Sequence, residues 1–171
     1  TRERTLRHPL PKSLVHLLRK PKQVWQIVRL TAKLPKNHPE EFLNQPKSPG
    51  KIVACLGDSI TLGNVSYDWV SNLRTRFNSS HTQFINAGIN SNVVWQLNQR
   101  VPTILSCAPQ VAIVLIGTND VMGSYHQADG RSYQRQGRLP NLPTQSGYER
   151  ELRKLLRSLQ NIRHVAVCTL P

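Results

Sequence analysis

Three short stretches of the sequence place polar, reactive residue types directly after apolar runs. Gly57-Asp58-Ser59 follows the run 52–56, the stretch 86–90 (Asn-Ala-Gly-Ile-Asn) ends a second run, and the stretch 117–120 (Gly-Thr-Asn-Asp) ends a third. Hydroxyl, carboxylate and carboxamide groups at the end of a buried strand are costly unless something uses them. A serine hydroxyl becomes a nucleophile once a base takes its proton. The three stretches are therefore candidate parts of one reaction site.

The elements that must position these stretches are strands alternating with helices. The predicted strands are 51–56, 82–86, 110–116 and 163–169, and the predicted helices are 66–77, 92–105 and 146–160. The third and fourth runs are apolar throughout, which is typical of parallel strands buried on both faces. The alternation predicts a three-layer α/β/α sandwich with a parallel sheet. Such sheets bind ligands at the carboxyl ends of their strands, where all three polar stretches should meet.

One segment of this region carries no periodic pattern. Residues 123–147 contain Gly, Ser, Gln, Pro and three arginines, and we predict one long loop there. Loops of that length in compact domains often carry function. Its arginines (Arg131, Arg135, Arg138) could meet an anionic group, although solvated surface charges are the simpler explanation.

The three polar stretches together resemble a known family. The segments LGDSITLG, INAGINS and IGTND, in this order and spacing, are similar to the first three sequence blocks of the SGNH or GDSL hydrolases, a family of esterases and lipases. The resemblance covers about residues 51–171. It implies a flavodoxin-like SGNH hydrolase fold and hydrolysis of a carboxylic ester through an acyl-enzyme. It also implies that no metal or organic cofactor is needed, and that the partner is a small-molecule or lipid ester.

The resemblance also implies roles for individual residues. Ser59 would be the nucleophile, and the oxyanion hole would consist of the Ser59 N–H, the Gly88 N–H and the Asn119 carboxamide. One such donor can lower a barrier by about 3–4 kcal/mol. Simpler interpretations are a helix cap for Ser59 and for Asn119 and an ordinary turn for Gly88.

Three further residues would support these groups. They are Gly57, Asp58 and Asp120. We expect Asp58 to order the nucleophile turn by accepting backbone hydrogen bonds, and Asp120 to be structural. The second block departs from the family pattern, because a further glycine often follows Gly88, whereas Asn90-Ser91 occupies that place here.

The family takes its catalytic aspartate and histidine from a D-x-x-H block that this sequence lacks. Its histidines are His8, His16, His38, His81, His126 and His164. Of these, His126 alone is expected near Asn119. We therefore expect a chain truncated before its fifth strand, the following helix and the catalytic pair, and acting as a weak or inactive hydrolase.

Residues 1–50 differ from the remainder in composition. They hold 11 of the 23 Lys and Arg but only 3 of the 9 acidic residues, and the net charge of the whole chain is +14. We interpret 1–50 as a basic, proline-punctuated extension with helices at about 12–20 and 22–34, and 51–171 as the hydrolase domain. An alternative function is an inactive fragment whose basic helices in 12–34 contact an anionic membrane surface. A solvated basic helix is the simpler interpretation of this segment.

Several functional classes are excluded by the sequence. It contains no run of about 18 apolar residues that could span a membrane and no Walker A phosphate-binding pattern. The few aromatic residues show no stacking arrangement, so no nucleic acid is expected. The three cysteines, Cys55, Cys107 and Cys168, have no metal-binding or disulfide spacing. We predict a cytoplasmic protein, with peripheral membrane contact as the alternative.

Overall fold

The computed structural model describes residues 34–46, 49–77 and 81–169. One compact unit begins at Leu34. The helices expected at about 12–20 and 22–34, and with them the expected membrane contact, lie outside the described residues apart from Leu34 itself. Among the described residues, no helix is long and apolar enough to cross a membrane.

A four-stranded parallel sheet forms the centre of this unit. The strand order is β2-β1-β3-β4, and every neighbouring pair is parallel. The strands are β1 (Lys51–Gly57), β2 (Thr82–Gly88), β3 (Val111–Leu115) and β4 (His164–Val167). The four strands and the parallel α/β sandwich predicted from the sequence are therefore confirmed.

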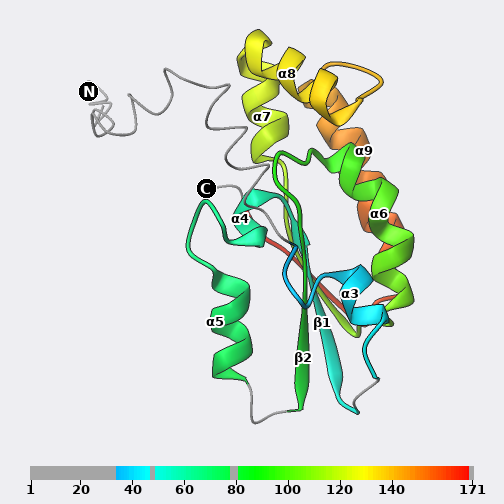
Figure 1. The fold of residues 1–171 in the computed structure, drawn as a ribbon. Helices are drawn as coiled ribbons and strands as arrows, with labels where there is room; N and C mark the ends of the chain where they lie inside the picture. The colour runs from blue at the N-terminus through cyan, green and yellow to red at the C-terminus, as the bar shows by residue number, and fades with distance from the viewer. Residues whose placement is uncertain (1–33, 47–48, 78–80, 170–171) are drawn as a thin grey trace, which may run out of the picture. The chain divides into compact units, whose positions relative to one another are not determined.

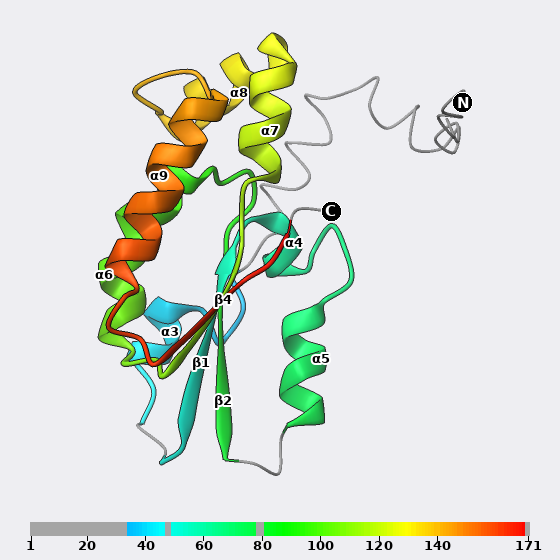
Figure 2. The same cartoon turned by 180° about the vertical axis from the view of Figure 1, so that it is seen from behind.

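Helices cover both faces of the sheet (Figures 1 and 2). Helices α6 (Val94–Ser106) and α9 (Gln145–Ser158) lie on one face, and α5 (Trp69–Arg76) lies on the other. Two helices start at carboxyl ends of strands: α4 (Ser59–Leu62) after β1 and α7 (Thr118–Tyr125) after β3. The three polar stretches of the sequence are therefore brought to one edge of the sheet.

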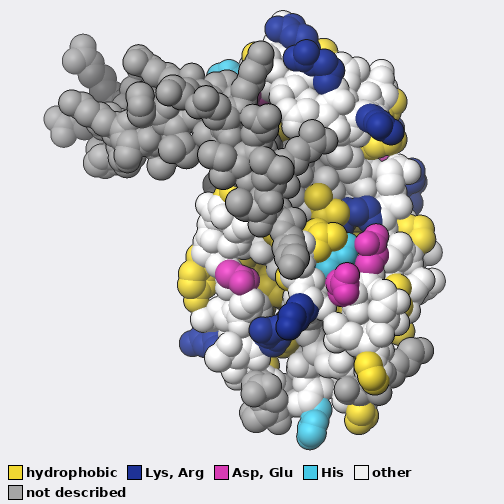
Figure 3. Space-filling model, in the orientation of Figure 1, with side chains coloured by type: hydrophobic (Ala, Val, Ile, Leu, Met, Phe, Trp, Pro, Cys, Tyr) yellow, Lys and Arg dark blue, Asp and Glu magenta, His cyan; other side chains and the backbone are white. Residues whose placement is uncertain are grey.

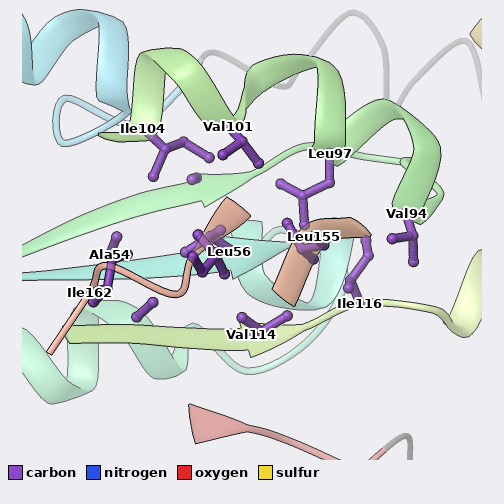
Figure 4. Packing of buried hydrophobic residues seen from close by; sticks show 13 residues of the cluster. Ala54, Leu56, Val94, Leu97, Val101, Ile104, Val114, Ile116, Leu155 and Ile162 are labelled. Carbon is purple, nitrogen blue, oxygen red and sulfur yellow. The ribbon is translucent and has the colours of Figure 1, made fainter. Parts of the chain in front are cut away.

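Side-chain alternation along the strands produces two separate cores. Ala54 and Leu56 of β1 point toward α6 and α9, where Figure 4 shows them packed among other aliphatic side chains. Val53 and Cys55, the alternate residues, point toward α5 and pack with Val70. Burying both faces of β1 in this way holds its carboxyl end in the middle of the sheet.

Part of the segment assigned to the extension belongs to this unit. The backbone oxygen of Asn37 accepts a hydrogen bond from the Asn86 N–H at 3.0 Å, and its side-chain Nδ2 donates to the Phe84 carbonyl at 2.9 Å. These bonds cover part of the open edge of β2. Helix α3 (Pro39–Leu43) packs on β2 and α6. Residues 34–46 and 49–50 therefore pack as part of the same unit as the strands that follow them.

Two expectations about the later elements are corrected. The stretch 123–147 is not one loop, because α7 extends to Tyr125 and α8 (Gln127–Gly137) follows it. The sequence of α8 is too polar to show an apolar helical pattern. The helix nevertheless packs on α7, where Gly130 lies against the Gly123 carbonyl. Strand β4 is not buried on both faces: all four of its residues are exposed, and among the described strands it lies at the end of the sheet, next to β3 alone.

Candidate active site

The candidate nucleophile lies at the turn that joins β1 to α4. Ser59 is the first residue of α4 and is half-buried. The preceding Asp58 is buried and caps the helix, since its Oδ1 accepts a hydrogen bond from the Ile60 N–H at 2.9 Å. Burial raises the pKa of the Asp58 carboxyl, and the Ile60 bond opposes that shift. Asp58 thus orders the turn as the sequence predicts, and it takes the capping role considered for Ser59.

Glycines at the ends of β1 and β2 let α4 sit directly on the sheet. Gly57 pairs with Gly88 across the two strands. A Cβ on Gly88 would collide with the backbone nitrogen of Leu62, and one on Gly57 would collide with the Thr61 hydroxyl and the Leu115 carbonyl. The α4 turn therefore lies in contact with the ends of β1, β2 and β3 together.

Replacing Gly88 with alanine should destabilise the fold. The new methyl group would press on the backbone of Leu62, which cannot rotate away as a side chain can. We expect a loss of about 1–3 kcal/mol in the free energy of unfolding, measured by urea denaturation. Gly147→Ala is the control, because its Cβ would meet only the side chains of Thr144 and Arg150. Equal losses for both variants would contradict the close packing of α4 on β2.

The block after β3 is tied to the block after β2. Asn119 is buried, and its Nδ2 donates to the backbone oxygen of Asn92 at 2.9 Å. The Asp120 carboxylate accepts a hydrogen bond from the Val94 N–H at the start of α6, at 3.1 Å. Asp120 thus ties the start of α7 to the start of α6, and Gly117 holds the capping position of α7. One N–H of the Asn119 amide remains for a ligand.

The backbone N–H of Gly88 is already engaged. It donates to Asn86 Oδ1 at 3.0 Å, and both residues are buried. Gly88 permits the close approach of α4 in this structure, and its N–H is held by the Asn86 side chain. Three residues farther on, Ser91 has a left-handed backbone with φ of +62°. This is the turn in which the sequence lacks the expected second glycine, and its amide groups lie between β2 and α6.

Arg100, which no sequence motif singles out, holds several parts of the site together through hydrogen bonds. This half-buried arginine of α6 donates from Nε to Asn92 Oδ1 at 3.1 Å, from Nη1 to the Ala87 carbonyl at 2.8 Å and from Nη2 to the Gly57 carbonyl at 3.2 Å. It therefore joins the ends of β1 and β2 to the turn that follows β2. The sequence does indicate that Arg100 lies near the sheet, because it follows Leu97 by three residues and so lies beside the apolar face of α6.

Burial makes Asp120 a pH-sensitive group. Desolvation raises its pKa from 3.8 to about 7, and the Val94 N–H bond opposes that shift. The folded protein then holds the Asp120 proton more tightly than the unfolded chain does, so protonation of Asp120 stabilises the fold. This stabilisation is complete below about pH 4 and is lost as the pH rises through 7. The change amounts to at most about 4 kcal/mol.

The Asp120→Asn variant tests this assignment. Asparagine keeps an oxygen that can accept the Val94 N–H, but it carries no charge to desolvate. We expect the variant to be more stable than the parent at pH 8 and to show a flatter dependence of unfolding free energy on pH. Asp129→Asn, which removes the same charge from half-buried Asp129 on α8, should keep the parental slope. An unchanged slope in Asp120→Asn would contradict the assignment.

None of the described histidines hydrogen-bonds to Ser59. His81 precedes β2 and His164 begins β4, at the opposite edge of the sheet from Ser59. His126 is exposed at the junction of α7 and α8, and His38 is buried beside α3. Within the described ranges, no group of three or more His, Cys, Asp or Glu residues could hold a metal ion.

The model of the GDSL-like lipase/acylhydrolase family matches residues 55–171, which include all three polar stretches. No curated protein gives a significant match.

Several solved structures share the fold. The SGNH-hydrolase family esterase AlinE4 is 20% identical with a TM-score of 0.51, and the match covers 74% of this chain and 63% of that one. A catalytic mutant of the acetylxylan esterase Axe2 from Geobacillus stearothermophilus is 20% identical with a TM-score of 0.54, covering 72% and 61%. A GDSL-like lipase from Bacteroides thetaiotaomicron is 16% identical with a TM-score of 0.52, covering 75% and 54%. The present chain thus spans 54–63% of the lengths of these structures.

Proposed function

Because the chain belongs to the GDSL-like lipase/acylhydrolase family, we propose that it carries the nucleophile half of a serine esterase site. The observation that supports this most is the position of Ser59. It is a half-buried hydroxyl on the first residue of α4, in a turn that Asp58 orders and that packs on the ends of two neighbouring strands.

In the proposed reaction Ser59 Oγ attacks the carbonyl carbon of an ester. A base takes the hydroxyl proton, and the carbonyl oxygen becomes an oxyanion. The alkoxide then leaves with a proton as the alcohol, and water hydrolyses the acyl-Ser59 intermediate to release the carboxylic acid and free the serine. No metal or organic cofactor takes part in this scheme.

Donors for the oxyanion come from three chain segments in this proposal. The Ser59 N–H is at the start of α4, where the helix dipole favours negative charge. The second N–H of the Asn119 amide comes from α7, with its other N–H fixed on Asn92. The third proposed donor is the Gly88 N–H, which donates to Asn86 Oδ1 at 3.0 Å in the structure and would share or exchange this bond with the oxyanion.

Because none of the described histidines hydrogen-bonds to Ser59, we propose that the 171-residue chain is an impaired hydrolase. The substrate is a small-molecule or lipid ester, and its acyl group is open. The test is hydrolysis of p-nitrophenyl acetate and p-nitrophenyl decanoate by the chain, with Ser59→Ala as control. We expect slow turnover that the variant loses. Equal turnover by the chain and the variant would contradict the proposal, and the ratio of the two esters measures the acyl preference.

A further inference from the structure

A pocket, called here the His38 pocket, lies near the carboxyl edge of the sheet, on the side of α6. Its volume is about 230 Å³. The residues lining it are Leu34, His38, Pro39, Glu40, Ile89, Gln99, Arg100, Thr103 and Ile104. Figure 3 shows acidic and histidine side chains gathered over α3, with a basic side chain close to them. The pocket is distinct from the Ser59 turn, because its lining comes from α3, α6 and the residue that follows β2.

His38 is the least satisfied polar group of this pocket. Its side chain is only 4% exposed, and neither ring nitrogen has a hydrogen-bond partner. A neutral imidazole has one donor and one acceptor, and each buried polar atom left unpaired costs about 1–3 kcal/mol. Native proteins rarely keep such groups without a use. We therefore infer that a polar molecule hydrogen-bonds to the ring nitrogens of His38.

Arg100 gives the same pocket a positive charge. Three of its five N–H groups are used by Asn92, Ala87 and Gly57, so two remain. Burial lowers its pKa to about 10, which leaves the guanidinium charged at neutral pH. Among the described residues, the only ion pair joins Arg150 to Glu151, so Arg100 has no carboxylate in direct contact.

We propose that this pocket binds a small oxyanion, a carboxylate or phosphate group, between the Arg100 guanidinium and the His38 imidazole. A guanidinium with two free N–H groups suits two oxygens of one anion, and a ring N–H of His38 supplies a further donor. Exposed Glu40 lies at the rim and opposes an anion through like charge. The proposal does not depend on esterase activity.

The position of the pocket gives such binding a consequence. Arg100 also holds the Gly57 and Ala87 carbonyls, which immediately precede the Asp58-Ser59 turn and Gly88. An anion bound to Arg100 would accept hydrogen bonds from the same guanidinium that donates to these two carbonyls. Occupancy of the pocket is therefore coupled to the framework of the candidate active site by a single side chain.

The test is a titration of the 171-residue chain with sodium phosphate and, separately, sodium acetate, at pH 7 and constant ionic strength. The readout is the NMR signal of the His38 ring nitrogens. We expect a saturable shift with at least one of the two anions, and the comparison of the two identifies whether the pocket prefers phosphate or carboxylate. The absence of a saturable shift with both anions would overturn the proposal, leaving His38 paired with water alone.

Two substitutions on α3 make the test specific. Glu40→Gln removes the acidic group at the rim, and we expect the anion to bind about three-fold more tightly. Glu41→Gln removes the same charge from the next residue, which is exposed and does not line the pocket, and should change affinity by less. Equal effects of the two substitutions would show a general charge effect and would overturn the assignment of the pocket.

Discussion

Replacing Ser59 with alanine is expected to abolish covalent labelling of the chain by a fluorophosphonate. The probe reacts with an accessible serine in a site that stabilises the negative charge developing on the phosphonyl oxygen. Ser59 is half-buried at the start of α4, with its own N–H and the Asn119 amide as proposed donors. The measurement is the intact mass of the protein after incubation with excess probe.

The same experiment tests the missing base. A serine hydroxyl reacts slowly until a base removes its proton, and none of the described histidines hydrogen-bonds to Ser59. We therefore expect slow labelling of the parent chain that free imidazole in the buffer accelerates at least ten-fold. Imidazole should have no effect on Ser59→Ala. Fast labelling that is insensitive to imidazole would show that the chain already contains its base.

Ser66→Ala is the matched control for this experiment. Ser66 lies a few residues after Ser59 and is exposed, and its hydroxyl donates to the Ile60 carbonyl at 3.2 Å. The variant should be labelled like the parent. Labelling that persists in Ser59→Ala but disappears in Ser66→Ala would move the nucleophile away from the site described.

Replacing Arg100 with methionine should be the most destabilising of the substitutions considered. Methionine fills much of the volume but leaves Asn92 Oδ1 and the Ala87 and Gly57 carbonyls without the arginine donors. Unpaired buried acceptors cost about 1–3 kcal/mol each, although the Gly57 carbonyl keeps its bond from the Ile89 N–H. We expect a loss of about 3 kcal/mol or more in the free energy of unfolding.

Urea denaturation followed by circular dichroism measures this loss. The control is Arg74→Met, because Arg74 is an exposed arginine near the end of α5 and its replacement should change stability by less than about 0.5 kcal/mol. If Arg100→Met were as stable as the parent, Arg100 would not hold the strand ends together. That result would also contradict the proposed coupling of the His38 pocket to the Ser59 turn.

The strands could be predicted from the sequence because their signals are local. Val53 to Leu56 is an apolar run that stops at Gly57, and the structure buries both of its faces. Helix α8 could not be predicted, because its sequence is polar and its packing depends on the contact of Gly130 with Gly123 of α7. Likewise, an apolar run does not reveal whether a strand is central or at an edge, which is why β4 was expected to be buried.

The sequence predicts the edge of the sheet at which the site lies better than it predicts the hydrogen-bond partners within the site. Parallel strands bring their carboxyl ends together, so the three polar stretches predict the edge at which Ser59 and Asn119 lie, and the family resemblance implies their roles. The stretches do not reveal that Asn86 binds the Gly88 N–H, since that bond depends on a side-chain rotamer. Nor do they reveal that Arg100 reaches two strands across the helix–sheet interface. Such long-range partners are determined by packing.

A crystal structure of the chain after reaction with a fluorophosphonate would test the central claim most directly. The claim is that separate segments of the chain converge on one point at the carboxyl edge of the sheet. We predict a phosphorus bonded to Ser59 Oγ, with one phosphonyl oxygen within about 3 Å of both the Ser59 N and Asn119 Nδ2 atoms. A phosphonyl group that faces solvent without a contact to Asn119, or one that is attached to another residue, would contradict it.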